Sequence, residues 1–360
     1  MHPLQNVPLA PLSTLGVGGS ARWFLRADTV EGVEAAHAWA GRRSVPMFVL
    51  GGGSNLVVAD GGFKGLVLQV GIGGVSVDPQ GSSTLVRVGA GEPWDNVVAA
   101  AVDRGLAGLE CLSGIPGNAG GTPIQNVGAY GQEVADTLDE VVVFDREAAR
   151  MMTLAASECA FGYRMSRFKQ ADAGRFVVCR VTFSLRPGSP HVTYPDVVEH
   201  LTVAGVATPT LADVRGAVLA IRRGKGMVLD AADPDTRSVG SFFMNPVVPA
   251  ATHASIVAAH PDRRVPGFVL PEGAVKIPAA WLIEQAGFAR GYQHGAAGLS
   301  SKHPLALINR GGATAREVVA LATQIKHAVA ARFGIRLRPE PIFVGFEDDP
   351  EVEYLQRANG

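Results

Sequence analysis

A glycine-dense segment in the first half of the chain constrains the fold more than any other feature. It runs from Ser113 to Gly131 with the sequence SGIPGNAGGTPIQNVGAYG. The glycines leave few side chains that could pack into a core, whereas Asn118, Gln125 and Asn126 supply hydrogen-bond donors and acceptors. Such a segment is typical of backbone that wraps a polar heteroaromatic cofactor.

A second glycine run follows an apolar segment. Residues 47–50 are expected to form a β-strand, and the chain continues with Gly51, Gly52, Gly53, Ser54 and Asn55. Consecutive backbone N–H groups in such a run can converge on an anion such as a pyrophosphate. Taken alone, the run is equally compatible with a tight glycine turn. Two such loops in one domain favour a dinucleotide-like ligand.

Strand-like and helix-like patterns both occur along the chain, which predicts an α+β or α/β fold. The clearest expected strands lie at residues 47–50, 66–68, 85–88, 141–144, 176–179 and 305–308, and the expected helices at 29–41, 94–104, 211–223, 278–286 and 314–333, with a short helix near Ala155. Gly105 is a plausible residue to end the helix before it. Residues 187–190 contain two prolines and indicate a boundary, and the acidic stretch 347–353 is expected to be a solvated tail.

Composition excludes several classes of protein. The chain has 360 residues, of which 47% are hydrophobic and 18% charged, as in globular proteins of more than one domain. The formal net charge of -1 gives no global field for a nucleic acid or an anionic membrane. Neither a leader nor a membrane-spanning stretch is evident, so we expect a cytoplasmic protein. No feature of the sequence predicts an oligomeric state.

The cysteines and histidines give no metal pattern. Cys111, Cys159 and Cys179 are isolated and odd in number, which suits a reducing compartment, and we expect all three to be buried. His191 and His200 are too far apart for one helical face and have no carboxylate companion. No metal site is therefore expected.

Two nucleotide-binding motifs are disfavoured. Residues 16–21 formally fit the Rossmann glycine pattern, but residues 11–15 before them lack a strand pattern and no βαβ unit with a ribose-binding acid follows. No Walker lysine follows any of the glycine runs, which argues against a P-loop ATPase.

Seven motifs in order along nearly the whole chain resemble the UDP-N-acetylenolpyruvoylglucosamine reductase (MurB) family. They lie at residues 14–19, 51–55, 116–131, 161–169, 240–246, 280–287 and 339–341. The resemblance implies an α+β fold, with a two-lobed FAD-binding domain of the vanillyl-alcohol-oxidase (PCMH) type and an α+β substrate-binding domain. The expected parts are FAD lobe 1 at 1–70, FAD lobe 2 at 71–190, the substrate-binding domain with a C-terminal catalytic segment at 191–346, and an acidic tail at 347–360.

The resemblance also implies an activity. A member of this family uses NADPH and non-covalent FAD to reduce UDP-N-acetylglucosamine enolpyruvate to UDP-N-acetylmuramate, in peptidoglycan precursor synthesis. Hydride passes through flavin N5 to the vinyl carbon C3, and a proton reaches C2. The residues expected to bind FAD are Gly51, Gly52, Gly53, Ser54, Asn55, Gly114, Pro116, Gly117, Asn118, Gly120, Gly121, Thr122, Gln125, Asn126, Gly128, Ala129 and Tyr130.

Three residues match the family's catalytic positions. Arg164 would clamp the enolpyruvyl carboxylate, since its guanidinium fork matches a carboxylate at two points, although a surface salt bridge is the alternative. Ser241 would donate the proton to C2, or would otherwise be a turn hydroxyl. Glu340 lies between two prolines that hold it rigidly, and it would act in protonated form or by polarising the double bond through a shared network.

Four further residues match substrate contacts. Residues 192–196 resemble the tyrosine-bearing loop that defines one type of the family, so Tyr194 is expected to cover the substrate and Lys225 to meet its negative charge. Asn245 would hydrogen-bond a phosphate or sugar oxygen, and Tyr163 is a further expected contact. One departure is Met244, where many relatives carry a basic residue.

Two other functions are compatible with a flavin-binding fold of this type, that of a flavin oxidase and that of a non-catalytic binding protein. A flavin oxidase of the same fold would often tether FAD through a histidine, and neither glycine loop contains one. A non-catalytic nucleotide-sugar or flavin sensor would keep the loops and lose Arg164, Ser241 or Glu340, and all three are present.

Overall fold

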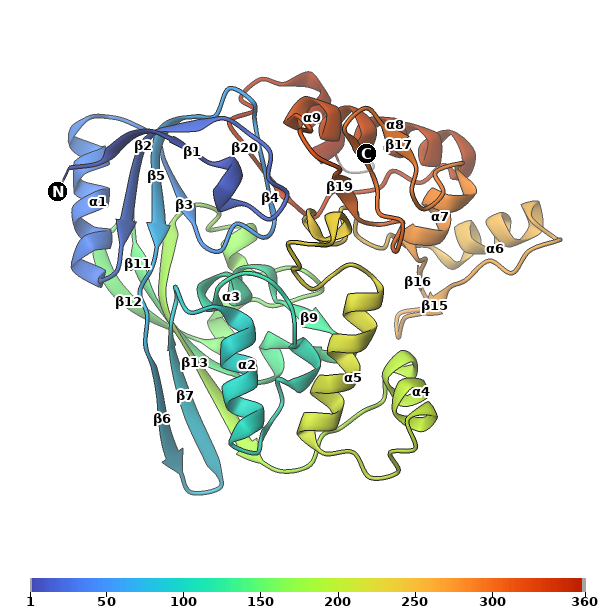
Figure 1. Cartoon of the computed structure of the whole chain (residues 1–360), viewed down its shortest axis with the longest axis horizontal. Coiled ribbons are helices and arrows are strands. Elements are labelled where there is room, and N and C mark those ends of the chain that lie inside the picture. Colours follow the sequence, from blue (N-terminus) through green and yellow to red (C-terminus); the bar gives the residue numbers. More distant parts are fainter. Residues whose placement is uncertain (1, 358–360) are drawn as a thin grey trace. The chain divides into compact units, whose positions relative to one another are not determined.

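The computed structural model describes residues 2–357, which fall into two compact units (Figure 1). The first unit contains residues up to 7, residues 21–53 and residues 64–228, and the second contains residues 8–20, 54–63 and those from 229 onwards. Residues 191–228 therefore belong to the first unit, whereas we expected them to open the substrate-binding domain. The functional division of the chain stays a prediction.

A four-stranded sheet with the order β1-β2-β5-β3 opens the first unit. Its strands are β1 (Leu4–Pro8), β2 (Ser20–Ala27), β5 (Phe63–Val70) and β3 (Met47–Leu50). Strands β3 and β5 are parallel, which places the end of β3, and hence the start of the Gly51 run, beside Gln69. Helix α1 (Val30–Arg42) follows β2 and starts where the Thr29 hydroxyl accepts a hydrogen bond from the Gly32 amide.

A second, six-stranded sheet contributes many of the buried residues in the core of the first unit. Its order is β12-β11-β13-β7-β6, and β8 pairs with the end of β13. The strands are β12 (Arg150–Ala155), β11 (Leu138–Asp145), β13 (Phe176–Pro187), β7 (Ser83–Gly89), β6 (Val75–Gln80) and β8 (Leu106–Ala107). Central β13 is antiparallel to both neighbours, and Val181 faces Val141 on one side and Val88 on the other, all three fully buried. Such β-branched pairs stabilise the sheet.

Three helices of the first unit pack together. Helix α5 (Leu211–Gly224) packs against both α2 (Trp94–Asp103) and α4 (Pro195–Val203) (Figure 1). A capping box between Thr210 and Asp213 starts α5. The smaller elements are α3 (Thr122–Gln125), β9 (Gly128–Ala129), β10 (Gln132–Glu133), and 3₁₀ helices at Glu110–Leu112, Ala119–Gly121, Val134–Asp136, Ala156–Cys159 and Arg167–Lys169.

The second unit is built around helix α8 (Ala315–Phe333), whose buried face includes Val318, Ala322, Ile325 and Val329. Its other helices are α6 (Ala250–Ala259), α7 (Ala279–Gln285) and α9 (Pro350–Gln356), with 3₁₀ helices at Ala10–Leu12 and Pro234–Thr236. The strands are β14 (Val247–Val248), β15 (Phe268–Val269), β16 (Val275–Lys276), β17 (Gln293–His294), β18 (Ala297–Leu299), β19 (Leu307–Asn309), β20 (Ile342–Val344) and β4 (Leu56–Val58). Strands β20 and β4 are parallel.

Most local expectations are confirmed. The expected helices match α1, α2, α5, α7 and α8, and Gly105 lies just beyond α2 with φ +70. The glycines at 16–19 lead into strand β2 and not into a helix, so they do not form a Rossmann turn. All three cysteines are buried, as expected, and unpaired.

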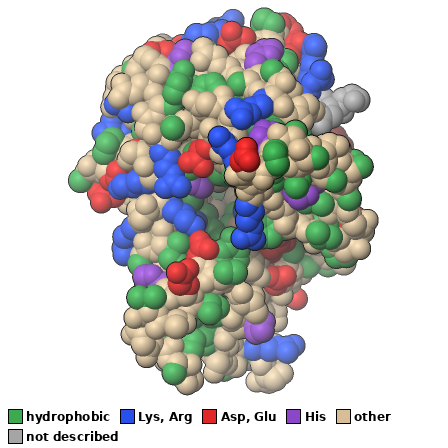
Figure 2. All heavy atoms as spheres, turned by 90° about the vertical axis from the view of Figure 1, so that its right-hand side faces the viewer, with side chains coloured by type: hydrophobic (Ala, Val, Ile, Leu, Met, Phe, Trp, Pro, Cys, Tyr) green, Lys and Arg blue, Asp and Glu red, His purple; other side chains and the backbone are tan. Residues whose placement is uncertain are grey.

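Membrane and metal features are not found in residues 2–357. No helix in this range has both the length and the apolarity needed to cross a bilayer. Within the same range no group of His, Cys, Asp and Glu is arranged to hold a metal ion. Acidic and basic side chains are interspersed on the face shown in Figure 2, in keeping with the formal net charge of -1.

The acidic stretch near the C-terminus was wrongly expected to be a solvated tail. Residues from Pro350 form helix α9, in which Val352 and Leu355 are buried against the core of the second unit. Lys326 of α8 is fully buried, and its Nζ donates to the carbonyls of Tyr354 (2.8 Å), Leu355 (2.7 Å) and Arg357 (2.9 Å). The lysine thus satisfies the carbonyls at the end of α9, where a cation is favoured.

Replacing Lys326 with methionine should keep the side-chain volume and leave the end of α9 without its donors. We expect Lys326→Met to lower the free energy of unfolding by about 3 kcal/mol, because buried carbonyls lose hydrogen bonds to a charged group. Chemical denaturation measures this change, and Lys64→Met, at an exposed position on β5, is the control. Equal stability of the two variants would contradict the role given to Lys326.

Candidate active site

The two glycine runs lie against each other within the first unit. A Cβ atom on Gly52 would come within 2.6 Å of the Cα of Gly117 and 2.9 Å of the backbone nitrogen of Asn118. Only glycine permits this approach, because real Cβ atoms essentially never come so close to backbone. The run after β3 and the loop after α2 therefore form one continuous backbone surface.

This surface presents backbone donors that the protein does not use. Among residues 2–357, no protein acceptor bonds the amides of Gly52, Gly53 or Asn118, and Gly53 is buried. A buried amide needs a partner, and neighbouring amides of this kind suit an anion such as a diphosphate. A Cβ on Gly51 or Gly121 would meet nothing within 4 Å, so the surface also has open space beside it. These features fit the expected dinucleotide.

The start of the long loop is anchored to helix α5. The Gly114 amide donates to Oδ1 of Asp95 (2.6 Å), and Arg215 of α5 holds the same carboxylate at two points, 2.6 Å and 2.8 Å. Although burial opposes it, the hydrogen bonds from Arg215 and Gly114 hold the pKa of Asp95 below its usual value. A two-point arginine–carboxylate pair fixes orientation as well as distance.

The side chains of Asn126 and Gln125 in the long loop make hydrogen bonds to other residues of the protein. Asn126 is buried, and its amide donates to Oε2 of Glu133 (2.8 Å) and to the carbonyl of Gly162 (3.0 Å). Its Oδ1 accepts from the amide of Ala135 (3.1 Å). Oε1 of Gln125 accepts from Lys169 Nζ (2.7 Å). These residues shape the loop, and their expected contacts with FAD stay a prediction.

Tyr163 and Arg164 form the tip of a two-residue turn. Gly162 and Met165 pair on either side of it through two backbone hydrogen bonds of 3.0 Å each. Arg164 adopts φ +55, which is uncommon for a residue with a side chain and is often found at functional sites. Its Nη2 donates to the carbonyl of Gly128 (2.6 Å). The glycine-rich loop therefore helps to orient this arginine.

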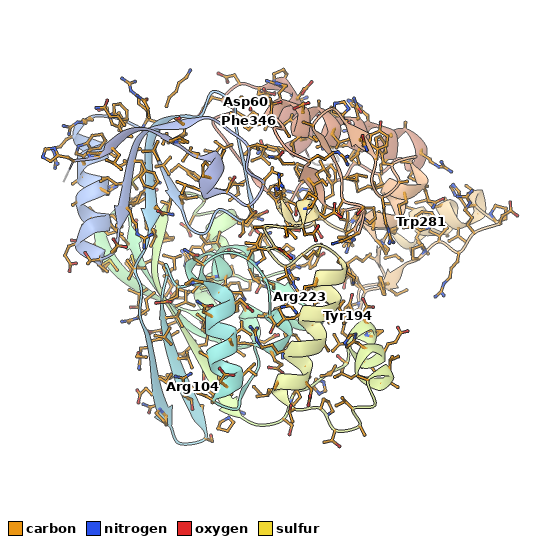
Figure 3. All side chains as sticks on the ribbon, in the orientation of Figure 1. Asp60, Arg104, Tyr194, Arg223, Trp281 and Phe346 are labelled. Atoms are coloured by element: carbon orange, nitrogen blue, oxygen red, sulfur yellow. The ribbon has the colours of Figure 1, made fainter. Side chains whose placement is uncertain are left out.

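Tyr194 and Lys225 lie together with Tyr130 of the glycine-rich loop. The rings of Tyr130 and Tyr194 meet edge to face with centroids 5.3 Å apart, and Lys225 Nζ lies 5.9 Å from the Tyr130 centroid. Lys225 ends helix α5 and pairs with Asp196, at 2.8 Å. Figure 3 marks Tyr194, just before α4, and Arg223, near the end of α5. The structure thus brings two expected substrate residues and one expected cofactor residue together.

Arg222 is a residue that the sequence reasoning missed. It is buried, donates to the Met227 carbonyl (2.9 Å) and interacts electrostatically with Tyr130, while its Nε has no partner among the described residues. Burial lowers the pKa of Arg222 and, in the same cluster, raises the pKa of Tyr130. The available signal was its position two turns beyond Arg215, on the same face of one helix.

Ser241 and Glu340 lie on paired segments of the second unit. The Glu340 amide donates to the Phe242 carbonyl (2.8 Å), and the Met244 amide donates to the Arg338 carbonyl (3.0 Å). Phe242 and Phe243 are fully buried and fix the segment that follows Ser241. Backbone pairing of this kind brings the hydroxyl-bearing and carboxyl-bearing segments side by side.

Two expected ligand-binding asparagines make structural bonds in the second unit. Asn55 donates from its side chain to the Glu340 carbonyl (3.3 Å) and accepts from the Ile342 amide at its backbone carbonyl (3.0 Å). Oδ1 of Asn245 accepts from the Ala279 amide (2.9 Å), the first residue of α7. Asn55 thus supports the rigid position of Glu340.

The expected site residues are divided between the two units. The first unit holds Arg164, Tyr163, Tyr194, Lys225, Gly51 to Gly53 and the loop residues Gly114, Pro116, Gly117, Asn118, Gly120, Gly121, Thr122, Gln125, Asn126, Gly128, Ala129 and Tyr130. The second unit holds Ser54, Asn55, Ser241, Asn245 and Glu340. The convergence of Arg164, Ser241 and Glu340 on one substrate stays a prediction.

A cavity of about 330 Å³ in the second unit contains none of the expected residues. Asp60 and Phe346, both marked in Figure 3, are among its lining residues. The Asp60 carboxylate accepts from the first amides of α8, and Arg316 pairs with Asp349 (2.7 Å). Asp60 thus caps helix α8, and Arg316 and Asp349 form an ion pair.

Alanine at position 52 should separate the two glycine runs. Because its Cβ would overlap the backbone of Gly117 and Asn118, we expect Gly52→Ala to weaken FAD binding at least about tenfold. The test is a fluorescence titration of the deflavinated protein with FAD. Gly41→Ala, in a helix where a Cβ meets nothing within 4 Å, is the control. FAD affinity equal in both variants would show that the contact is irrelevant to the cofactor.

Two family models match this chain. An FAD binding domain model matches residues 21–153, and a model described as the C-terminal domain of UDP-N-acetylenolpyruvoylglucosamine reductase matches residues 233–344. These matches confirm the expected α+β architecture, in which an FAD-binding part precedes a separate C-terminal domain.

Full-length relatives agree with these models. UDP-N-acetylenolpyruvoylglucosamine reductase of Thermobifida fusca is 49% identical over 95% of this chain and 98% of its own length. The Streptomyces avermitilis enzyme of the same name is 46% identical over 96% of each chain. The crystal structure of the Thermus caldophilus MurB enzyme aligns with a TM-score of 0.64 at 26% identity, covering 94% of this chain and 98% of that one. This chain belongs to the UDP-N-acetylenolpyruvoylglucosamine reductase family.

Proposed function

We propose that this protein uses NADPH and non-covalently bound FAD to reduce the enolpyruvyl group of UDP-N-acetylglucosamine enolpyruvate, which gives UDP-N-acetylmuramate for peptidoglycan synthesis. The observation that carries the proposal is the 49% identity to a reductase of that name across 95% of the chain. A cytoplasmic location is part of the proposal, supported by three buried cysteines without disulfide partners.

Arg164 is proposed to stabilise the charge that develops on the substrate. FAD, when bound, takes hydride from NADPH and supplies it to the vinyl carbon C3. Addition at C3 moves negative charge towards C2 and the carboxylate, where a two-point guanidinium contact is worth most. Supporting this role, Arg164 sits at the tip of a tight turn and is oriented by the Gly128 carbonyl at 2.6 Å.

Ser241 is proposed to donate the proton that C2 requires. A hydroxyl is a weak acid, but the enolate-like species is a strong base, so the position of the donor matters more than its acidity. Two buried phenylalanines after Ser241 and the backbone bond from Glu340 to Phe242 hold this segment in place. A fixed donor of this kind needs little reorganisation during the reaction.

Glu340 is proposed to polarise the reacting double bond from a fixed position. Its two flanking prolines restrict the backbone, its amide donates to Phe242, and its carbonyl accepts from Asn55. Its backbone is therefore held from three directions. A backbone so constrained carries the carboxyl on a segment paired with the one that follows Ser241.

Tyr194 and Lys225 are proposed to contact the UDP part, together with Tyr163 and Asn245. The exposed ring of Tyr194 can cover a ligand and exclude water, and Lys225 can meet the charge of the diphosphate. Tyr163, whose ring is also exposed, lies beside Arg164 at the turn. Support for Asn245 is weaker, because Oδ1 already caps α7.

An anaerobic titration tests the overall proposal. The purified holoenzyme should lose its oxidised flavin absorbance when NADPH is added. Subsequent addition of the enolpyruvyl UDP-sugar should restore that absorbance and yield UDP-N-acetylmuramate. Reoxidation by oxygen alone, with no response to the sugar, would instead indicate an oxidase.

Ser241→Ala should separate the two halves of the reaction. We expect flavin reduction by NADPH to stay within about twofold of the parent, while turnover of the enolpyruvyl sugar falls about 10³-fold because the proton donor is lost. Rapid-mixing absorbance measurements follow each half. Ser255→Ala, on exposed α6, is the control and should change neither. Normal turnover of Ser241→Ala would contradict the assignment.

Arg164→Lys should show whether the guanidinium fork matters beyond its charge. Lysine keeps the charge and loses the two-point contact, so we expect kcat to fall about 10²-fold. Steady-state rates with the enolpyruvyl sugar give this value. Arg104→Lys, at the exposed end of α2 (Figure 3), is the matched control. A kcat within twofold of the parent would remove Arg164 from the reaction.

A further inference from the structure

Asp196 forms an ion pair with Lys225, the residue proposed to meet the charge of the substrate's diphosphate. Its Oδ2 lies 2.8 Å from Lys225 Nζ, and both side chains are partly exposed, at 46% and 36%. Asp196 is in the first turn of α4, one residue after the proline that follows Tyr194. The carboxylate and the lid-like tyrosine therefore belong to one short segment.

The surroundings of this pair are cationic. Buried Arg222 interacts electrostatically with Arg164 and with Tyr130, over which Lys225 lies. Asp95, a carboxylate that acts on Arg222, is already held at two points by Arg215. Asp196 thus stands where an anionic ligand would meet Lys225.

We propose that Asp196 is a specificity-determining residue, which holds Lys225 when no substrate is bound and yields it to the diphosphate of the nucleotide sugar. This inference rests on the proposed function. The exchange is energetically easy because an exposed ion pair contributes only a few-fold to an equilibrium constant. A diphosphate offers more charge and more acceptors than the carboxylate it replaces, whereas a ligand with one negative charge gains little. Asp196 therefore favours diphosphate-bearing ligands over singly charged ones.

The direction in which Asp196→Asn changes UDP affinity shows whether Asp196 competes with the ligand for Lys225 or positions Lys225 for it. If Asp196 competes with the ligand, Asp196→Asn should tighten UDP binding about two- to fivefold, the range of an exposed pair. If Asp196 instead positions Lys225 for the ligand, the same variant should weaken binding. Calorimetric titration of the FAD-loaded enzyme with UDP measures the dissociation constant directly. The KM for the enolpyruvyl sugar should fall by the same factor, and kcat should not rise.

Two further variants make the test specific. Glu199→Gln removes an exposed charge from the same helix and should change the UDP dissociation constant by less than twofold. In a Lys225→Met background, Asp196→Asn should have no effect, because Asp196 acts through the lysine. Weaker or unchanged UDP binding by Asp196→Asn, or an equal gain in the Lys225→Met background, would overturn the inference and leave the proposed function intact. Failure of the parent enzyme to bind UDP would overturn both.

Discussion

The close approach of Gly52 to Gly117 and Asn118 is the constraint on which the cofactor-binding part depends. It joins the end of strand β3, in the four-stranded sheet, to the loop that follows α2. The contact joins backbone amides of the two runs into one surface. Within residues 2–357 the amides of Gly52, Gly53 and Asn118 have no protein acceptor, which suits the phosphates of FAD.

Helix α5 connects this cofactor surface to the proposed substrate contacts. Arg215 anchors the start of the long loop through Asp95, Arg222 interacts electrostatically with Tyr130 near its end, and Lys225 lies at the end of the helix. Because Arg215, Arg222 and Lys225 belong to one helix, the helix fixes their spacing. The segment from 191 to 228 is accordingly part of the first compact unit, although its tyrosine and lysine are proposed to act on the substrate.

Many of the helices and strands could be predicted from the sequence, and the predictions that were wrong failed for physical reasons. Local signals were sufficient for α8, where Thr314 and Glu317 form a capping box before an apolar stripe. Helix α9 was missed although Asp349 caps its start, because the burial of Val352 and Leu355 and the bonds from Lys326 are tertiary contacts. The glycine runs were recognised from composition, but Asn126 proved to be engaged internally, since the partners of a polar side chain depend on tertiary contacts. The Arg215–Asp95 pair spans 120 residues and has no sequence signal.

We propose that Arg164, Ser241 and Glu340 act on one enolpyruvyl group. A crystal structure of the FAD-loaded enzyme with the enolpyruvyl UDP-sugar tests it most directly. We expect the Arg164 guanidinium on the substrate carboxylate, Ser241 Oγ within hydrogen-bond reach of C2, and the Glu340 carboxyl beside the same group. Any of these side chains lying more than a substrate's width from the enolpyruvyl carbons would contradict it.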